Sequence, residues 1–140
     1  MMDESVRKAL WSNTQECPYS SKLGLRVIEI DKGYSRMEMD VHPDLFNIYG
    51  TLHGGAIFSL IDEAFQAASN AHGTTAVALN MTISYLAAPK SESRLTAEAR
   101  ELHLTRRTGH YEIKVTDDQG RLIATCQALA YRKGQPLPFL

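Results

Sequence analysis

Two kinds of hydrophobic spacing alternate along the chain. Apolar and polar positions alternate with a period of two between residues 24 and 41 and again in several runs after residue 76, which is typical of strands with one buried face. From Gly54 to about Ala71 the apolar positions recur every three or four residues instead, which predicts one long helix. Together the two patterns predict an α+β protein.

Six strands are expected. The first two flank a turn at Asp31–Gly33 and form a hairpin with one wet face, because apolar and charged side chains alternate along the second strand. These side chains are Met37, Met39 and Val41 against Arg36, Glu38 and Asp40. Four more runs follow at residues 76–86, 94–104, 110–117 and 121–132. The last run is apolar on both faces, so we expect it inside the sheet, covered on one side by the long helix and on the other by a subunit or segment.

The long helix has an apolar face, an opposite side and a shoulder between them. The apolar face carries Ile57, Leu60, Ile61, Ala64 and Ala68. Ser59, Glu63, Gln66 and Asn70 lie broadly opposite, and Phe58, Asp62 and Phe65 occupy the shoulder. A shorter amphipathic helix is expected from Glu4 to Ser12, ending near Pro18. Because one helix covers only one face of a six-stranded sheet, apolar surface is left for a second copy, and we expect a homo-oligomer.

Composition excludes several functions. The chain has 140 residues, a formal net charge of -1 and an isoelectric point near 6.5, so it lacks the basic surface of a nucleic-acid-binding protein. No run approaches the roughly 18 apolar residues of a membrane span or resembles a signal peptide, so we expect one cytoplasmic domain over residues 1–140. Cys17 and Cys126 lack a C-x-x-C spacing, no histidine pair has ligand spacing, and Cys126 is expected in the core, so no metal site is predicted.

The start of the long helix, His53-Gly54-Gly55, suits acyl-transfer chemistry. Its unpaired N–H groups lie where no side chain crowds a ligand, and the helix dipole adds partial positive charge that stabilises an oxyanion. Asp62 supplies a carboxylate about 12 Å further along the same helix, whereas reaction with the bound carbonyl requires contact at about 3 Å. We therefore expect two antiparallel helices from two subunits to share each site, with Gly54 of one chain facing Asp62 of the other.

The residues around this helix start resemble a family signature. Asn47, Gly50, His53-Gly54-Gly55, Leu60, Asp62 and Ala64 have the spacing found in hotdog-fold acyl-CoA thioesterases of the phenylacetate-degradation (PaaI) type. The order of the elements is similar to that of a hotdog domain over essentially the whole chain. The resemblance implies a hotdog fold, in which a six-stranded antiparallel sheet wraps around a long central helix, with a short N-terminal helix. It also implies hydrolysis of an acyl- or arylacyl-CoA without a metal or cofactor.

The resemblance further implies four catalytic roles. The Gly54 N–H binds the thioester carbonyl, and Asp62 of the neighbouring subunit acts as general base or nucleophile. Asn47 orients the carbonyl or the water, and His53 holds the turn and Asn47 in place. A plain turn cap at Asn47 and a structural role for His53 are the alternatives. Some relatives carry Ser or Thr on the first strand after the helix, where this chain has Ala78.

Six further residues are candidates for substrate binding: Gly55, Phe58, Phe65, Tyr85, Arg106 and Arg107. The aromatic side chains would line an acyl pocket and the arginines would meet the phosphates of coenzyme A, with core packing and solvation as the alternatives. The expected assembly is a homodimer with shared sites, paired into a tetramer. A non-catalytic acyl-CoA-binding module and a hotdog dehydratase are the alternative functions, and aromatic, medium-chain and long-chain acyl groups all fit.

Overall fold

The computed structural model describes residues 1–140, in which three α-helices and six strands are the main elements. The helices are α1 (Glu4–Gln15), α2 (Pro18–Leu23) and α3 (Gly54–Asn70), with a short 3-10 turn, η1, at Pro43–Leu45. The strands are β1 (Arg26–Asp31), β2 (Tyr34–Asp40), β3 (Thr74–Tyr85), β4 (Arg94–Leu104), β5 (Thr108–Thr116) and β6 (Leu122–Pro136). The expected long helix and all six strands are confirmed, with ends that differ by a few residues.

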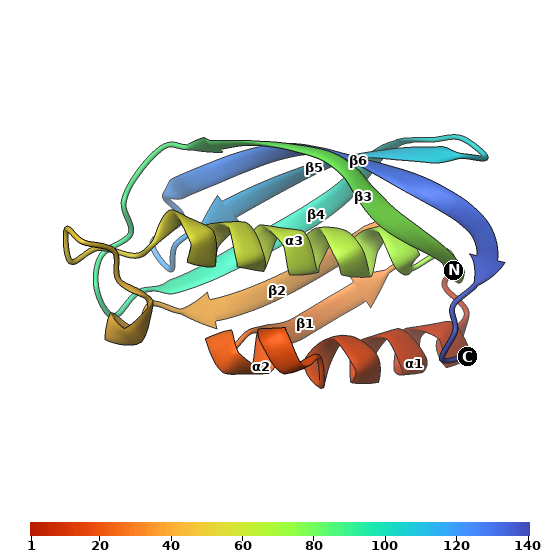
Figure 1. Cartoon of the computed structure of the whole chain (residues 1–140), viewed down its shortest axis with the longest axis horizontal. Helices are drawn as coiled ribbons and strands as arrows, with labels where there is room; N and C mark the ends of the chain where they lie inside the picture. The colour runs from red at the N-terminus through yellow and green to blue at the C-terminus, as the bar shows by residue number, and fades with distance from the viewer.

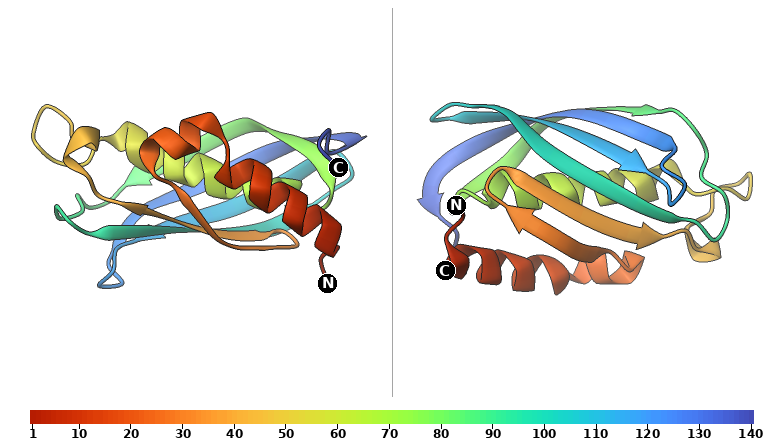
Figure 2. Two further views of the ribbon diagram at one scale, coloured as in Figure 1. Left: turned by 90° about the horizontal axis from the view of Figure 1, so that it is seen from below. Right: turned by 180° about the vertical axis from the view of Figure 1, so that it is seen from behind.

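The sheet curves around α3, as Figure 1 shows. Its strand order is β1-β2-β4-β5-β6-β3, and every neighbouring pair is antiparallel. The hotdog arrangement is therefore confirmed, and so is the interior position of β6, which lies between β5 and β3. Seen from behind, the outer face of β4, β5 and β6 carries no helix (Figure 2).

The core fills the space between α3 and the concave face of the sheet. The alternation of β2 is confirmed, because Met37 and Met39 are fully buried while the charged residues between them reach the other face. The same holds for β5, where Tyr111 and Ile113 point inward. Phe65 of α3 packs edge-on against Tyr111, with ring centroids 5.4 Å apart. Such packing fixes the rotation of α3 and so determines which of its residues stay accessible.

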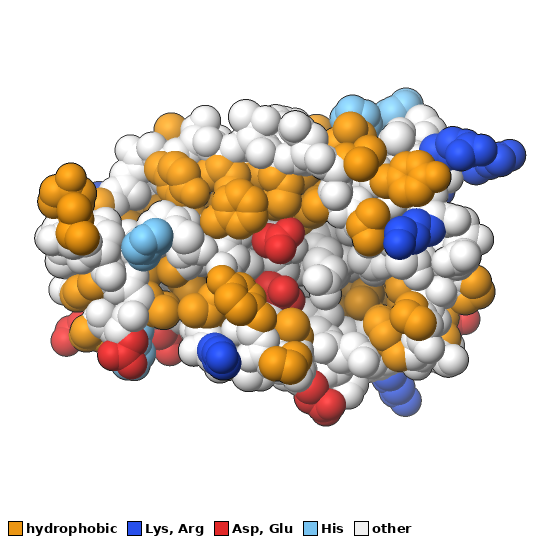
Figure 3. All heavy atoms as spheres, in the orientation of Figure 1, with side chains coloured by type: hydrophobic (Ala, Val, Ile, Leu, Met, Phe, Trp, Pro, Cys, Tyr) orange, Lys and Arg blue, Asp and Glu red, His pale blue; other side chains and the backbone are white.

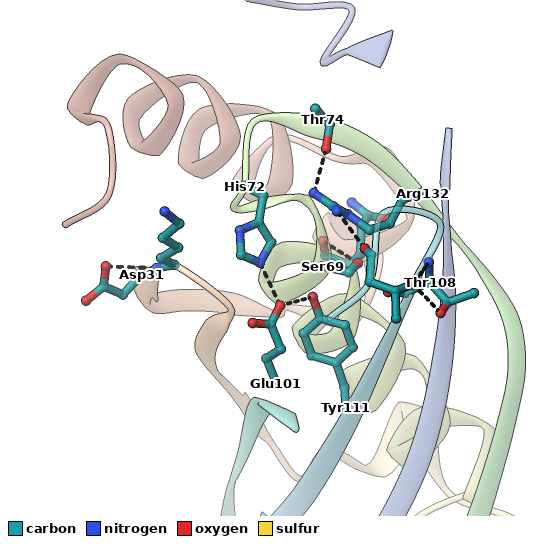
Figure 4. A network of polar contacts seen from close by, with 11 residues as sticks. Asp31, Ser69, His72, Thr74, Glu101, Thr108, Tyr111 and Arg132 are labelled. Atoms are coloured by element: carbon teal, nitrogen blue, oxygen red, sulfur yellow. Dashed lines mark hydrogen bonds and ion pairs between the residues drawn. The ribbon is translucent and has the colours of Figure 1, made fainter. Parts of the chain in front are cut away.

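A polar network anchors the C-terminal end of α3 to the sheet (Figure 4). Glu101 of β4 accepts a hydrogen bond from the Tyr111 hydroxyl at 2.9 Å, and the same oxygen lies 2.6 Å from Nε2 of His72, just after α3. Burial raises the pKa of Tyr111, and the Glu101 carboxylate adds to this effect. This network holds the C-terminal end of α3. The N-terminal end of α3 lies at the opposite end of the molecule, next to the loop that precedes it.

The helical segment before the sheet is longer than expected. The sequence predicts one helix from about Glu4 to Ser12, ending near Pro18. In the structure α1 continues to Gln15, and Pro18 then opens a second helix, α2, because proline is well suited to the first position of a helix. This pair of helices, called the arm below, packs beside α3 and below β1 (Figures 1 and 2). Consequently Ser59 and Glu63, on the side of α3 opposite its apolar face, are buried rather than solvated. Asn70, further along the same side, is buried as well, and its side chain is hydrogen-bonded to Ala76 of β3.

Glu63 is the unusual member of this buried side. Its side chain is 5% exposed, no cation lies against it, and Oε2 has no hydrogen-bond partner. Burial raises the pKa of Glu63, the nearby Ser20 hydroxyl lowers it somewhat, and the charge on Asp62 raises it further. Ser20 Oγ itself makes no hydrogen bond of good geometry. The arm therefore covers a carboxyl group whose ionised form is poorly compensated.

We expect Glu63→Gln to stabilise the protein at high pH and to have little effect in acid. Because the folded state holds the Glu63 proton more tightly than the unfolded chain, stability is lost as the pH rises from the ordinary value of 4.5 through the raised pKa. The neutral amide avoids this loss, a gain of roughly 1–3 kcal/mol at pH values above the raised pKa. Urea unfolding of both proteins across a pH series, at one protein concentration, measures the difference; equal stability throughout would contradict it.

None of α1, α2 and α3 combines the length and the hydrophobicity that a membrane-spanning helix requires.

Candidate active site

The first turn of α3 leaves a single backbone donor free. His53 caps the helix, since its Nδ1 accepts the N–H of Gly55 at 2.8 Å, and its carbonyl accepts those of Ala56 and Ile57 at 3.0 and 3.4 Å. The Gly54 N–H has no acceptor within the chain. Of the several free donors expected at this turn, only Gly54 therefore remains, and the His53 side chain serves as the cap. An accepting Nδ1 also requires the neutral imidazole with its proton on Nε2.

A hollow of about 370 Å³ opens beside this donor. Tyr85, at the end of β3, stands against Gly54: its hydroxyl donates to the Gly54 carbonyl at 3.3 Å, and its ring lies 3.4 Å from where a Cβ on Gly54 would be. The rest of the wall comes from Asn47, Thr51, Leu52, Ile57 and the segment Leu86–Pro89. The lining combines apolar side chains with polar groups, and Gly54 with its free N–H is one of the lining residues, which suits a carbonyl attached to an apolar group.

Asn47 shapes the loop that precedes the helix. Its Oδ1 accepts the N–H groups of Tyr49 at 2.9 Å and Thr51 at 3.2 Å, and its Nδ2 donates to the Thr51 hydroxyl at 3.0 Å. Gly50 has a φ of 74° in this turn, a conformation that favours glycine. Within the chain, then, Asn47 caps the turn, which is the alternative role considered for it from the sequence. Nδ2 makes a single hydrogen bond, so its second hydrogen has no acceptor in the chain, and Asn47 lines the same hollow as Gly54.

Asp62 lies two helical turns further along the accessible stripe of α3. It makes no hydrogen bond or ion pair in the chain, and burial alone raises the pKa of its carboxyl. Burial raises the pKa of the Cys126 thiol on β6 to about 11, and the charge of the nearby Asp62 adds to this effect. Cys126 is buried, as expected for a small core residue. A second hollow, of about 200 Å³, adjoins Asp62 between α3 and the start of β3.

The remaining predicted site residues divide between the two ends of α3. Phe58 lies on the same stripe midway between Gly54 and Asp62 and is exposed. Phe65 is 1% exposed; it belongs to the core and only borders the hollow beside Asp62. Arg106 and Arg107 are exposed in the turn between β4 and β5, at the C-terminal end of α3, far from Gly54 of the same chain (Figure 1).

Within one chain, then, the structure does not bring Gly54 and Asp62 together. Eight residues of straight helix separate them, about 12 Å. A second chain has an obvious place to pack, because β3 pairs only with β6 and leaves its other edge free. Large apolar side chains are exposed along this edge and the neighbouring stripe of α3: Phe58, Val77, Leu79, Tyr85 and Leu86. Hydrophobic groups surround the acidic ones at the centre of this face (Figure 3).

Two residues near the helix start were missed by the sequence reasoning. Tyr19 of α2 and Ser59 of α3 are hydrogen-bonded at 2.8 Å beside Gly55. Ser59 stands four residues after Gly55, so its reach to the Gly55 carbonyl is a signal that sequence spacing does contain. Tyr19 gave no signal, because the helix that carries it was not predicted.

Comparisons with known proteins identify the family. Residues 49–124 match the family model described as the thioesterase superfamily. A candidate esterase of Archaeoglobus fulgidus is 38% identical over 98% of this chain and 87% of its own. The acyl-coenzyme A thioesterase PaaI of Escherichia coli K12 is 35% identical over 80% of each chain.

Solved structures give the same result. The E. coli PaaI structure, from the phenylacetic acid degradation operon, superposes with a TM-score of 0.91 at 29% identity and covers 97% of this chain and 99% of that one. A hypothetical thioesterase protein from Streptococcus pneumoniae TIGR4, solved with coenzyme A, has a TM-score of 0.77 at 26% identity over 81% of this chain and 88% of that one.

Proposed function

The chain belongs to the thioesterase superfamily, and from this membership we propose that it is an acyl-CoA thioesterase, which hydrolyses an acyl- or arylacyl-CoA to the free acid and coenzyme A. Relatives named as thioester hydrolases support the reaction class, and a structural relative holds coenzyme A. The observation that carries the proposal is the Gly54 N–H: it is the one first-turn donor without an acceptor, and Gly54 lines a hollow that also has apolar walls.

The Gly54 N–H donates to the thioester oxygen and stabilises the negative charge that forms there as the carbonyl carbon becomes tetrahedral. The Asp62 carboxylate of the neighbouring subunit either removes a proton from the attacking water or attacks the carbonyl carbon itself. The carbon–sulfur bond then breaks, and coenzyme A leaves as the thiol after taking up a proton. If Asp62 attacks directly, water hydrolyses the resulting anhydride in a second step.

The shared site follows from the separation of Gly54 and Asp62 and from the open edge of β3. Two chains joined along β3 place their α3 helices antiparallel, so that the Gly54 end of one meets the middle of the other. The exposed apolar side chains along the edge of β3 and the neighbouring stripe of α3 are then covered. In the same arrangement Arg106 and Arg107 of one chain approach the Gly54 end of its partner, where the phosphates of coenzyme A would lie. A dimer of dimers and a cytoplasmic location remain predictions from the sequence.

The proposal is tested by following thioester absorbance during incubation with a panel of substrates: phenylacetyl-, hydroxyphenylacetyl- and benzoyl-CoA, and straight-chain acyl-CoA from butanoyl to hexadecanoyl. We expect hydrolysis of at least one class, at a rate proportional to enzyme concentration. Absorbance is preferred to a thiol dye because Cys17 is only partly buried and would react with the dye. Tight binding of acyl-CoA without hydrolysis of any panel member would instead identify a binding module.

A further inference from the structure

Tyr19 and Ser59 lie at the far end of a chain of hydrogen bonds that finishes at the Gly54 N–H. The Ser59 hydroxyl donates its one hydrogen to the Gly55 carbonyl at 2.8 Å. Ser59 Oγ also lies 2.8 Å from the Tyr19 hydroxyl. Because the Ser59 hydrogen is already used, the Tyr19 hydroxyl must be the donor in this second bond. The direction of donation therefore runs from Tyr19 through Ser59 to the backbone.

The chain continues through two peptide groups. The carbonyl of Gly55 shares its peptide group with the N–H of Ala56, which donates to the His53 carbonyl at 3.0 Å. The carbonyl of His53 in turn shares its peptide group with the N–H of Gly54. A peptide group whose carbonyl accepts a hydrogen bond is a stronger donor through its N–H, so polarisation adds up along the chain. The last donor in the series is the N–H that has no acceptor in the protein.

We propose that Tyr19 is a positioning residue for thioester hydrolysis, which acts through Ser59 and two peptide groups to polarise and hold the Gly54 N–H. The inference rests on the proposed function of Gly54 as the oxyanion donor. Tyr19 comes from the arm, and Ser59 is buried where the arm covers α3, so the arm contributes to the site without supplying a group that touches the thioester. Tyr85 reaches the neighbouring Gly54 carbonyl, which belongs to the next peptide group and lies outside this series.

Tyr19→Phe removes the first donor and keeps the aromatic ring. Polarisation strengthens each hydrogen bond by roughly 10–30%, and an oxyanion donor is worth about 10²–10³ in kcat, which sets an upper limit of about eightfold. Because two hydrogen bonds lie between the Tyr19–Ser59 bond and the Gly54 N–H, we expect kcat to fall by about twofold. KM should stay unchanged, because the bond to the carbonyl strengthens mainly as negative charge develops. Ser59→Ala should lose at least as much, because it removes both side-chain bonds of the series. The double variant should be no slower than the slower single variant, since breaking the series twice has no added effect.

The matched control is Tyr34→Phe. In the wild type the Tyr34 hydroxyl likewise donates to a residue on another element, Glu98 of β4, at 2.9 Å, but it lies outside the series that ends at Gly54. We expect it to keep the kinetic constants of the wild type. Thermal unfolding of all variants distinguishes a detached arm from a loss of polarisation. If Tyr19→Phe lowers kcat only by weakening the hydrogen-bond series, its melting temperature should fall no further than that of Tyr34→Phe.

A spectroscopic measurement tests the polarisation directly. Isotope-edited infrared spectroscopy of carbonyl-labelled phenylacetyl-CoA, bound to an Asp62→Asn background that slows turnover, reports the thioester stretching frequency. We expect the shift to lower frequency on binding to be smaller when Tyr19→Phe is added. If the wild type is active and Tyr19→Phe has the same kcat and the same carbonyl frequency, the inference is overturned. A Tyr19→Phe variant in which only KM rises overturns it as well. A wild type that binds phenylacetyl-CoA without hydrolysing any panel member overturns the proposed function. In that case the carbonyl frequency still shows whether Tyr19 polarises the Gly54 N–H.

Discussion

Replacing Asp62 with Asn is expected to lower kcat for acyl-CoA hydrolysis by about 10²–10⁴-fold and to leave acyl-CoA binding intact. Asn has nearly the same size and shape but neither removes a proton from water nor attacks a carbonyl. The fold should tolerate it, because Asp62 makes no hydrogen bond or ion pair in the chain and burial already disfavours its charge. Steady-state kinetics with the best substrate of the panel, together with thermal unfolding, measure both parts of the expectation.

The neighbouring carboxyl provides the matched control. Glu63→Gln makes the same change of acid to amide one residue further on, on the side of α3 that the arm covers, and should retain most of the wild-type kcat. Wild-type activity should also be lost in acid as the pH falls through the pKa of Asp62, which burial raises above its ordinary value of 3.8, because only the ionised carboxylate reacts. If Asp62→Asn kept the wild-type kcat, the carboxylate would have no part in the reaction.

The sheet and α3 could be predicted from the sequence because burial on one face leaves a clear periodic pattern. The bounds of β4 agree with the expected run at 94–104, and the inward positions of β2 follow directly from its alternation. Helix geometry alone also separated Gly54 from Asp62, and this separation is the reason to expect a site shared between subunits. These predictions depend on regular spacing, which a single sequence shows well.

The arm and the contacts of the helix start could not be predicted in the same way. α2 is six residues long, too short for a periodic pattern, and Pro18 is equally compatible with ending one helix and starting another. The burial of Ser59 and Glu63 follows from that missed helix. Likewise the glycines indicated an oxyanion donor and the family resemblance named the Gly54 N–H, but the bond from the Gly55 N–H to the His53 ring nitrogen depends on the orientation of that side chain, which spacing alone does not give.

Replacing Gly54 with Pro is expected to lower kcat by about 10²–10³-fold, because proline removes the single N–H on which the proposed oxyanion hole depends. The position suits proline in other respects. It is the first residue of α3, where no hydrogen bond within the chain is lost, and His53 before it already has φ -64° and ψ 136°, the extended conformation that proline requires of the preceding residue. Gly54→Ala is the matched control, since its added Cβ meets Tyr85 at an ordinary 3.4 Å and the N–H is kept.

Mixing the two inactive proteins tests whether each site is shared between subunits. When Gly54→Pro and Asp62→Asn subunits exchange in mild denaturant and refold, a mixed dimer has one site with both changes and one site with neither. Random pairing makes half of the dimers mixed, so roughly one quarter of the wild-type activity should return, by the symmetry of a two-fold dimer. Each variant refolded alone should stay inactive. If the mixture also stayed inactive while native gels showed mixed dimers, Gly54 and Asp62 would not act on one thioester across the interface.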